Sequence, residues 1–202
     1  MRLGLVGPSE EDPSLLRKAA RFLLDDREVE QAVYLGAEST LRSVVGAWAS
    51  EIMAGGASEE RFLAQAVELA LGAESRAIDR LLACDREVRK LNALRCLPPP
   101  PARAVELFED KVILFVHDKA MLDQEDIANA FLIVYGRGKR SAVHRFGPRT
   151  FFTPCPLKAG RVAVIERERD NNLAIAQFDP ETGEAHGREV LPVRRSRLVV
   201  TP

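Results

Sequence analysis

The chain has 202 residues, of which 46% are hydrophobic and 29% are charged, and its formal net charge is -1. This length suits one domain with a sizeable core, and the composition excludes a disordered chain. The near-zero net charge excludes a general attraction to nucleic acid or to anionic membranes, so any such affinity requires a local patch.

The three cysteines, Cys84, Cys96 and Cys155, have no CxxC spacing and are odd in number. They predict neither a disulfide framework nor a zinc site, and we expect buried thiols in a reducing compartment. The apolar run near the start is too short for a signal peptide, and no run approaches membrane-spanning length. The sequence therefore predicts a soluble, cytoplasmic protein that has no membrane partner.

The first half of the sequence alternates between strand and helix patterns. Two short apolar runs that end on glycine predict buried strands at residues 2–7 and 30–36. Apolar residues at helical spacing predict helices at 14–26 and 39–53, and Asp12-Pro13 supplies an N-cap and a first-turn proline for the first of them. This order requires a parallel sheet covered on both faces, with loops at the strands' carboxyl ends as the usual place for a site. Trp48, in the second helix, is expected to be a core residue.

A long helical stretch follows. Helices are expected at 59–71, capped by Ser58, and at 74–94. Each has an apolar stripe, and together the two helices resemble a helical hairpin laid on the domain. We therefore expect a single domain over residues 1–202 with a helical insertion at 55–95. The next segment, 97–104, contains four consecutive prolines that remove hydrogen-bond donors, so it is predicted to be a stiff connector.

The second half of the sequence is rich in strand patterns. Its predicted helix, residues 123–131, is capped by Asp123. Strands separated by turn residues are predicted at 104–109, 111–118, 132–136, 141–146, 149–154, 161–168, 172–179 and 197–200.

The loops after the strands form an ordered set. A strand-loop and a strand-glycine loop come first, then "FVHD", "VYGRGK" and "FFTPCPL", and then paired terminal strands. This order resembles the calcineurin-like metallophosphoesterases, especially their small YfcE and Vps29-type members. In that family "DxH", "GD", "GNxD" or "GNH", "HG" or "GH", "GHTH" and "NPGS" follow successive strands. The resemblance covers most of the chain apart from residues 55–92, and it implies an α/β fold, a two-sheet sandwich flanked by helices with an added helical hairpin.

The resemblance also implies that the metal-binding motifs are degenerate. The family's metal-site positions fall on Pro8, Glu10, Ala37, His117, Arg137 and Lys139, the last two in place of the histidines of "GHTH". The "GNxD" motif has no clear match, its nearest candidate lying near residues 92–96, and "NPGS" reads "TPCP" at 153–156.

Two-metal hydrolysis requires several carboxylate and imidazole ligands, including a bridging aspartate. The bridging position is Ala37, and the permanent charge of Arg137 would repel a divalent cation. Glu10 and His117 could hold a single ion, but two ligands without a third bind weakly. We therefore predict no dinuclear metal centre and no cofactor.

Arg137 and Lys139 allow two interpretations. They could replace metal charge with protein charge and, with His117, form an anion pocket that binds phosphate or a nucleotide without cleaving it. Alternatively, "GRGK" is an exposed basic loop with solvated side chains, which the absence of a Walker-type continuation favours.

Other residues carry weaker signals. Cys155, between two prolines, could be a reactive thiol near the basic loop, but burial is the favoured interpretation. His144 and His186 are expected at the surface. A wider basic cluster could recognise nucleic acid if its members converge: Arg137, Lys139, Arg140, His144, Arg145, Arg149, Arg194, Arg195 and Arg197. The near-neutral net charge and the 6% aromatic content argue against nucleic-acid binding.

Three classes of function follow. The first is a catalytically inactive metallophosphoesterase-fold protein that acts as a protein-interaction or regulatory module, as Vps29-type relatives do, with an unidentified protein partner. The second is a non-hydrolytic phosphate or nucleotide sensor that uses Arg137 and Lys139. The third is an atypical metal-dependent phosphoesterase.

Overall fold

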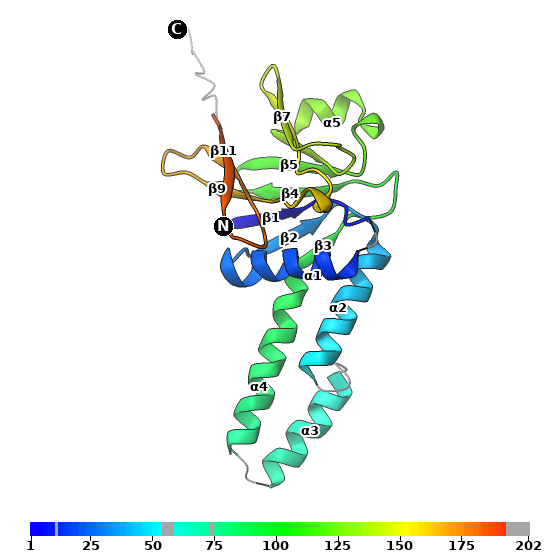
Figure 1. The fold of residues 1–202 in the computed structure, drawn as a ribbon, viewed down its shortest axis with the longest axis vertical. Coiled ribbons are helices and arrows are strands. Elements are labelled where there is room, and N and C mark those ends of the chain that lie inside the picture. The colour runs from blue at the N-terminus through cyan, green and yellow to red at the C-terminus, as the bar shows by residue number, and fades with distance from the viewer. Residues whose placement is uncertain (11, 54–58, 73–74, 193–202) are drawn as a thin grey trace, which may run out of the picture.

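The computed structural model describes residues 1–10, 12–53, 59–72 and 75–192. Two mixed β-sheets pack face to face, and helices cover their outer faces (Figure 1). Sheet A, in the order β11-β10-β9-β1-β2-β3, comprises β1 (Arg2–Val6), β2 (Gln31–Tyr34), β3 (Leu94–Cys96), β9 (Val162–Arg167), β10 (Leu173–Phe178) and β11 (Ala185–Leu191). Sheet B, in the order β4-β5-β6-β8-β7, comprises β4 (Ala104–Phe108), β5 (Lys111–Val116), β6 (Leu132–Tyr135), β7 (Ala142–Phe146) and β8 (Arg149–Thr153). The predicted α/β two-sheet sandwich is confirmed.

The central strands of each sheet run parallel. In sheet A, β1 pairs with β2 and β2 with β3 in parallel, and the antiparallel strands β9, β10 and β11 extend the sheet beyond β1. In sheet B, β5, β6 and β8 run parallel, and β4 and β7 are antiparallel edge strands. The loops that follow the parallel strands therefore gather where those strands end.

The main core lies between the two sheets. It contains large side chains from both sheets that are fully buried, among them Leu5, Phe108, Phe115, Phe152 and Ile165. Burial on both faces explains why these strands read as continuous apolar runs in the sequence.

Helices α1 (Pro13–Arg21), its π-helical continuation Phe22–Asp26, and α2 (Glu38–Ile52) pack on the outer face of sheet A. The Asp12 carboxylate accepts a hydrogen bond from the Leu15 N–H at 3.0 Å, which confirms the predicted N-cap. The short helix α5 (Gln124–Asn129) covers sheet B and begins with a capping box between Asp123 and Asp126. A 3₁₀ turn at Lys119–Met121 precedes it, and another at Leu157–Ala159 follows β8.

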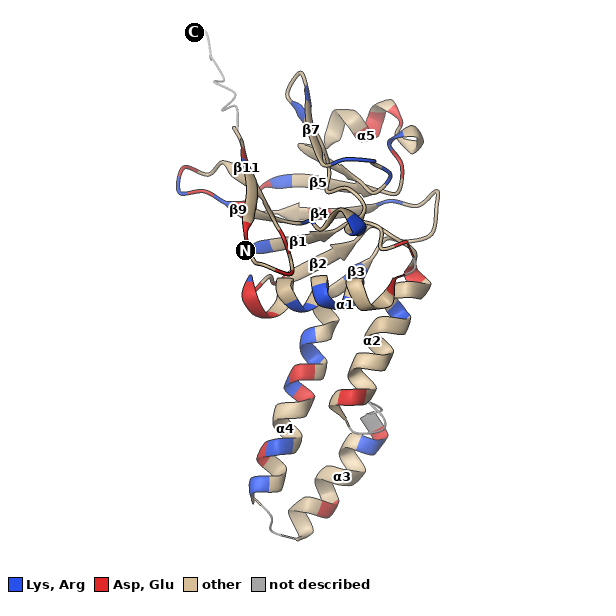
Figure 2. Ribbon diagram, viewed as in Figure 1, with Lys and Arg blue, Asp and Glu red and all other residues tan. Residues whose placement is uncertain are grey.

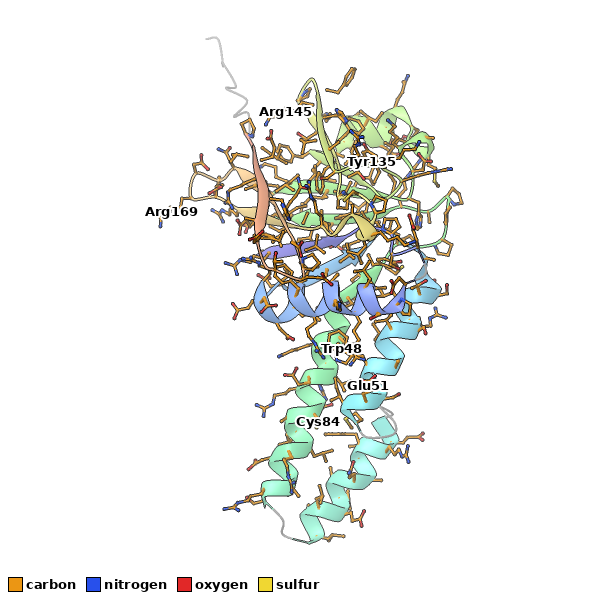
Figure 3. All side chains as sticks on the ribbon, viewed as in Figure 1. Trp48, Glu51, Cys84, Tyr135, Arg145 and Arg169 are labelled. Carbon is orange, nitrogen blue, oxygen red and sulfur yellow. The ribbon has the colours of Figure 1, made fainter. Side chains whose placement is uncertain are left out.

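Three helices form an arm that projects from the sandwich (Figure 1). They are α2, α3 (Glu59–Leu71) and α4 (Ser75–Lys90). Trp48 lies where the arm leaves the sandwich and is 7% exposed, as predicted for a core residue (Figure 3). The guanidinium groups of Arg17 and Arg21 lie 5.3 and 5.4 Å from the centre of its ring, and Arg17 donates to Glu51 at 2.7 Å. These contacts fix the base of the arm to α1.

Three predictions about elements need correction or lie outside the described residues. The helix expected over 74–94 ends at Lys90, and after a 3₁₀ turn the chain enters β3, whose three residues are too few to leave a strand pattern. Strand β11 was not predicted, because its hydrophilic edge position buries only Leu191 fully. The strand expected at 197–200 and the Ser58 cap lie outside the described residues. The limits of the helical insertion stay a prediction.

The cysteines are not uniformly buried. Cys155 is 1% exposed, but Cys84 and Cys96 are only partly buried. Cys84 borders a cavity of about 300 Å³ between α2, α3 and α4, and Cys96 lies on the edge strand β3. Among the described residues, no helix combines the length and the apolar character needed to cross a membrane.

Candidate functional site

The predicted site residues lie in loops at one edge of the sandwich, which we call the strand-end edge. The loops after β1, β2, β5 and β6 carry Pro8, Glu10, Ala37, His117, Arg137 and Lys139. Backbone hydrogen bonds join neighbouring loops here: the Arg137 N–H donates to the His117 carbonyl at 2.9 Å, and the Leu157 N–H donates to the Pro8 carbonyl at 2.8 Å. The fold thus brings these loops together, as the sequence order suggested.

A pair of hydroxyl groups fills the space between the ends of β1 and β2. The Tyr34 hydroxyl lies 2.8 Å from the Ser9 hydroxyl and accepts a hydrogen bond from the Ser9 N–H at 3.2 Å. Both residues are buried, with exposures of 3% and 0%. A Cβ atom at Gly36 would lie 2.2 Å from the Tyr34 hydroxyl, so a glycine is needed to admit the ring. These groups tie the first two loops together.

Backbone packing fills the space between the ends of β1 and β8. A Cβ atom at Gly7 would lie 1.7 Å from the carbonyl oxygen of Cys155, so the two chains approach as closely as glycine allows. Cys155 itself has a positive φ of 71° and is buried. Burial raises the pKa of its thiol, which keeps it protonated and unreactive at neutral pH. The burial expected for Cys155 is confirmed.

His117 links the loop after β5 to the loop after β3. Its Nε2 lies 3.0 Å from the carbonyl oxygen of Pro98, and a carbonyl can only accept, so Nε2 carries the hydrogen of this bond. A ring nitrogen that donates in this way has no lone pair for a metal ion.

Arg137 and Asp118 form an ion pair on this edge. The Arg137 guanidinium donates from Nη1 to Oδ2 of Asp118 at 3.1 Å, and the Ala120 N–H donates to the other carboxylate oxygen at 2.9 Å. The backbone hydrogen bond from Ala120 and the hydrogen bond from Arg137 lower the pKa of Asp118. Because the Arg137 side chain is 83% exposed, its charge faces solvent and a carboxylate.

Glu10 is also paired with a cation. Its carboxylate lies 2.7 Å from the Lys158 ammonium, and both side chains are about half exposed. This hydrogen bond raises the pKa of Lys158. Lys139 is exposed, and next to it Gly138 packs so closely on Thr153 that a Cβ atom would lie 2.4 Å from the threonine hydroxyl.

This set of residues does not fit a pair of divalent cations. Pro8 and Ala37 offer no side-chain donor atom, and Arg137 and Lys139 are cations themselves. Glu10 is committed to Lys158, and the Nε2 of His117 to Pro98. In the described part of the chain, no group of three or more His, Cys, Asp and Glu residues is arranged to hold a metal ion. Hydrogen bonds and packing therefore hold the strand-end edge together.

The wider basic cluster is engaged in separate contacts. Arg145 pairs with Glu189 of β11 at 2.6 Å, and Arg149 donates to the Ile127 carbonyl of α5 at 2.8 Å. His144 and His186 are exposed, as expected. Acidic and basic residues are interspersed over the sandwich (Figure 2). Arg194, Arg195 and Arg197 lie outside the described residues.

Three residues of this edge were not singled out from the sequence. Tyr34 and Pro98 form contacts with residues 25 and 19 positions away, which no local pattern signals. Asp118 had a usable signal, since an acid directly after a buried strand end lies at the same edge as the basic loop.

No family model and no curated protein matches this sequence. Solved structures do match. Vacuolar protein sorting 29 (Vps29) from Cryptosporidium parvum is similar with a TM-score of 0.54 and 12% identity over 95% of this chain and 98% of that chain. A single mutant of Vps29 from Entamoeba histolytica is similar with a TM-score of 0.53 and 12% identity over 95% of this chain and 100% of that one. An archaeal phosphodiesterase matches over 95% of this chain and 100% of its own with 12% identity and a TM-score of 0.46. The chain has the calcineurin-like metallophosphoesterase fold.

Proposed function

We propose that this protein is a catalytically inactive metallophosphoesterase-fold protein that acts through contacts with other proteins. The observation that carries the proposal is the chemistry of the strand-end edge. Where two-metal hydrolysis needs carboxylates and imidazoles, the chain places Pro8, Ala37, Arg137 and Lys139. The interior of this edge is occupied by the buried Tyr34–Ser9 hydroxyl pair.

The fold similarity to Vps29 supports the protein-binding part of the proposal. That protein is named for vacuolar protein sorting, and two of its structures share this fold with TM-scores above 0.5. Function inferred from fold is an analogy, so the partner has to be found by experiment. The cytoplasm is the compartment we propose, because its reducing conditions suit three cysteines that form no disulfide with one another.

Metal analysis and a hydrolysis assay test the absence of catalysis. The purified protein is incubated with Mn²⁺ or Zn²⁺, desalted, and analysed for bound metal, and then assayed on bis(p-nitrophenyl) phosphate. We expect far less than one equivalent of metal and turnover no faster than the buffer. Two equivalents of metal, together with turnover that His117→Ala abolishes, would show that the protein is a phosphoesterase.

The sensor alternative has its own measurement. Phosphate or ADP is titrated into the wild type and into Arg137→Ala while the melting temperature is followed. The inactive-module proposal predicts no saturable shift for either protein, because it assigns Arg137 to an exposed ion pair with Asp118 and not to a phosphate pocket. A saturable shift that is lost in Arg137→Ala and in Lys139→Ala would support a phosphate or nucleotide sensor instead.

A partner is to be identified by affinity capture from the source cells and then purified. Direct binding between the two purified proteins, measured by calorimetry, is the result we expect. If the captured protein, once purified, does not bind this protein in the calorimeter, it is not a direct partner. If no captured protein binds directly, the protein-interaction part of the proposal is wrong.

A further inference from the structure

The arm carries a stripe of apolar side chains that face solvent. On α3, Leu63, Val67 and Leu71 are 55%, 59% and 84% exposed, and their spacing of four residues places them on one side of the helix. On α4, Leu82 is 45% exposed. Four of the large apolar residues that are exposed in the described chain therefore lie on these two helices.

The opposite side of α3 is already used. Its residues Gln65 and Leu69 line the cavity between α2, α3 and α4 together with Ala77 and Leu81. A helix that is apolar on two sides normally packs against other elements on both sides. On α3, the side that carries Leu63, Val67 and Leu71 has no such packing within the described residues.

The exposed residues of the two helices share one face of the arm. Leu63 and Val67 each follow, by one position, a partly buried residue, Phe62 and Ala66, and Leu82 follows the buried Leu81 in the same way. Successive residues turn by about 100° in the same sense along each helix. Since α3 and α4 run in opposite directions (Figure 1), this turn places Leu63 and Val67 on the same face of the arm as Leu82.

The charges of the two helices are complementary. The sequence of α3 carries three glutamates and one arginine, whereas that of α4 carries five basic and three acidic residues. In Figure 2, α4 shows more blue segments than red ones. On α4, Arg80 and Arg86 donate to the backbone carbonyls of Arg76 and Leu82, which leaves their guanidinium groups at the surface of the helix.

We propose that the arm binds the arm of a second copy of this chain, so that α3 of each copy packs on α4 of the other in an antiparallel four-helix bundle. A two-fold axis parallel to the arm places each acidic helix opposite a basic one, and the contact occurs twice. This homodimer goes beyond the proposed function, because it depends neither on the loss of catalysis nor on another protein.

The area available on the two arms reaches the lower limit for a stable interface. A helix of 13 residues, the length of α3, is about 20 Å long, and half its circumference is about 16 Å, so one contacting side covers roughly 300 Å². Four such sides bury roughly 1,200 Å², the lower limit of standard protein–protein interfaces.

The two-fold axis also predicts which charges meet. Figure 1 shows that α3 and α4 run in opposite directions, so the first turn of α3, with Glu60, and the last turns of α4, with Arg86, both lie in the part of the arm nearer the sandwich. Rotation about an axis parallel to the arm keeps both residues in that part. We therefore take Glu60 of one copy and Arg86 of the other as the charge pair to test.

The first test is the mass of the full-length protein by sedimentation equilibrium between about 1 and 200 μM. We expect a reversible dimer whose dissociation constant rises at least tenfold in Val67→Glu. Glutamate is a better helix former than valine, so this variant keeps its helix, which circular dichroism checks. Val105→Glu is the matched control, because Val105 is 61% exposed, close to the 59% of Val67, and its strand β4 lies far from α3 in Figure 1.

The second test separates this packing from other dimers. Glu60→Lys and Arg86→Glu should each weaken the dimer severalfold, and the double variant should recover most of the loss. A wild-type protein that stays monomeric at 200 μM, or a dimer that is unchanged in Val67→Glu, overturns the proposal. Weakening by Val67→Glu with no recovery in the double variant overturns the packing of α3 on α4. None of these results depends on metal content or hydrolysis, so the two proposals fail independently.

Discussion

Removing the hydroxyl group of Tyr34 tests whether hydrogen bonding holds the strand-end edge together. In Tyr34→Phe the ring stays and only the oxygen is lost. That oxygen is the partner of both the Ser9 hydroxyl, at 2.8 Å, and the Ser9 N–H, at 3.2 Å. Because Ser9 is fully buried, neither group can turn to bulk water when its partner is removed.

The expected loss of stability follows from these two groups. An unsatisfied buried polar group costs about 1–3 kcal/mol, and we take the lower value for each of the two, which gives about 2 kcal/mol. For a domain of about this size, 1 kcal/mol shifts the melting temperature by about 2–4 °C. Tyr34→Phe should therefore melt about 4–8 °C below the wild type.

The assay is urea and thermal unfolding of a double-mutant cycle with Tyr34→Phe, Ser9→Ala and both together. The double variant should lose less than the sum of the single variants, because Ser9→Ala removes one of the groups that Tyr34→Phe orphans. Tyr135→Phe is the control. Tyr135 ends β6 as Tyr34 ends β2 and is 5% exposed, but its hydroxyl makes no hydrogen bond to the described residues. If Tyr34→Phe melted within 1 °C of the wild type, the reasoning would be wrong.

Three further predictions concern the same edge. Gly7→Ala should lower the free energy of unfolding by more than about 3 kcal/mol, because the new Cβ would lie 1.7 Å from a backbone carbonyl oxygen. Gly46→Ala on α2, where the new Cβ meets open space, should raise it by up to about 1 kcal/mol. Equal unfolding free energies for the two variants would contradict this. The folded-state pKa of Asp118 is lowered, so its contribution to stability is present above the unfolded pKa of about 3.9 and is lost as the pH falls through the folded pKa. Asp118→Asn should therefore destabilise the protein at pH 7 and have a smaller effect at pH 3, and an effect that is equal at both pH values would disprove it. The Thr153 hydroxyl is buried without a hydrogen-bond partner among the described protein atoms. Thr153→Val should therefore leave the free energy of unfolding in urea unchanged or raise it by up to about 1 kcal/mol. A loss above about 1 kcal/mol would show that the hydroxyl does form a hydrogen bond.

The sequence predicted the elements whose own residues determine them. The strands β1, β2, β5 and β6 are buried on both faces and therefore consist of apolar runs, and the caps at Asp12 and Asp123 depend on residues next to them. Strands β3 and β11 escaped prediction because their place in sheet A comes from pairing with β2 and β10. A short or hydrophilic edge strand has no pattern of its own.

The candidate site shows the same division. The order of the loops predicted which residues share the strand-end edge, because parallel strands bring their carboxyl ends together. The partners within the edge could not be predicted, since Tyr34 meets Ser9 and His117 meets Pro98 only after the strands are in register. The sequence alone predicted the residue types at the proposed metal-site positions, and the tertiary contacts show which hydrogen bonds and ion pairs those residues form.

The two surfaces of the molecule differ in what a ligand would have to displace. At the strand-end edge, an anion at Arg137 competes with Asp118, and a metal ion at His117 competes with the Pro98 carbonyl, so part of any binding energy is spent on breaking existing bonds. On α3, Leu63, Val67 and Leu71 are exposed apolar side chains that form no hydrogen bonds. Burying them removes apolar surface from water without loss of a protein hydrogen bond. The arm is therefore a surface of the described chain where association breaks no existing bond, and the packing around Trp48 holds its base on the sandwich.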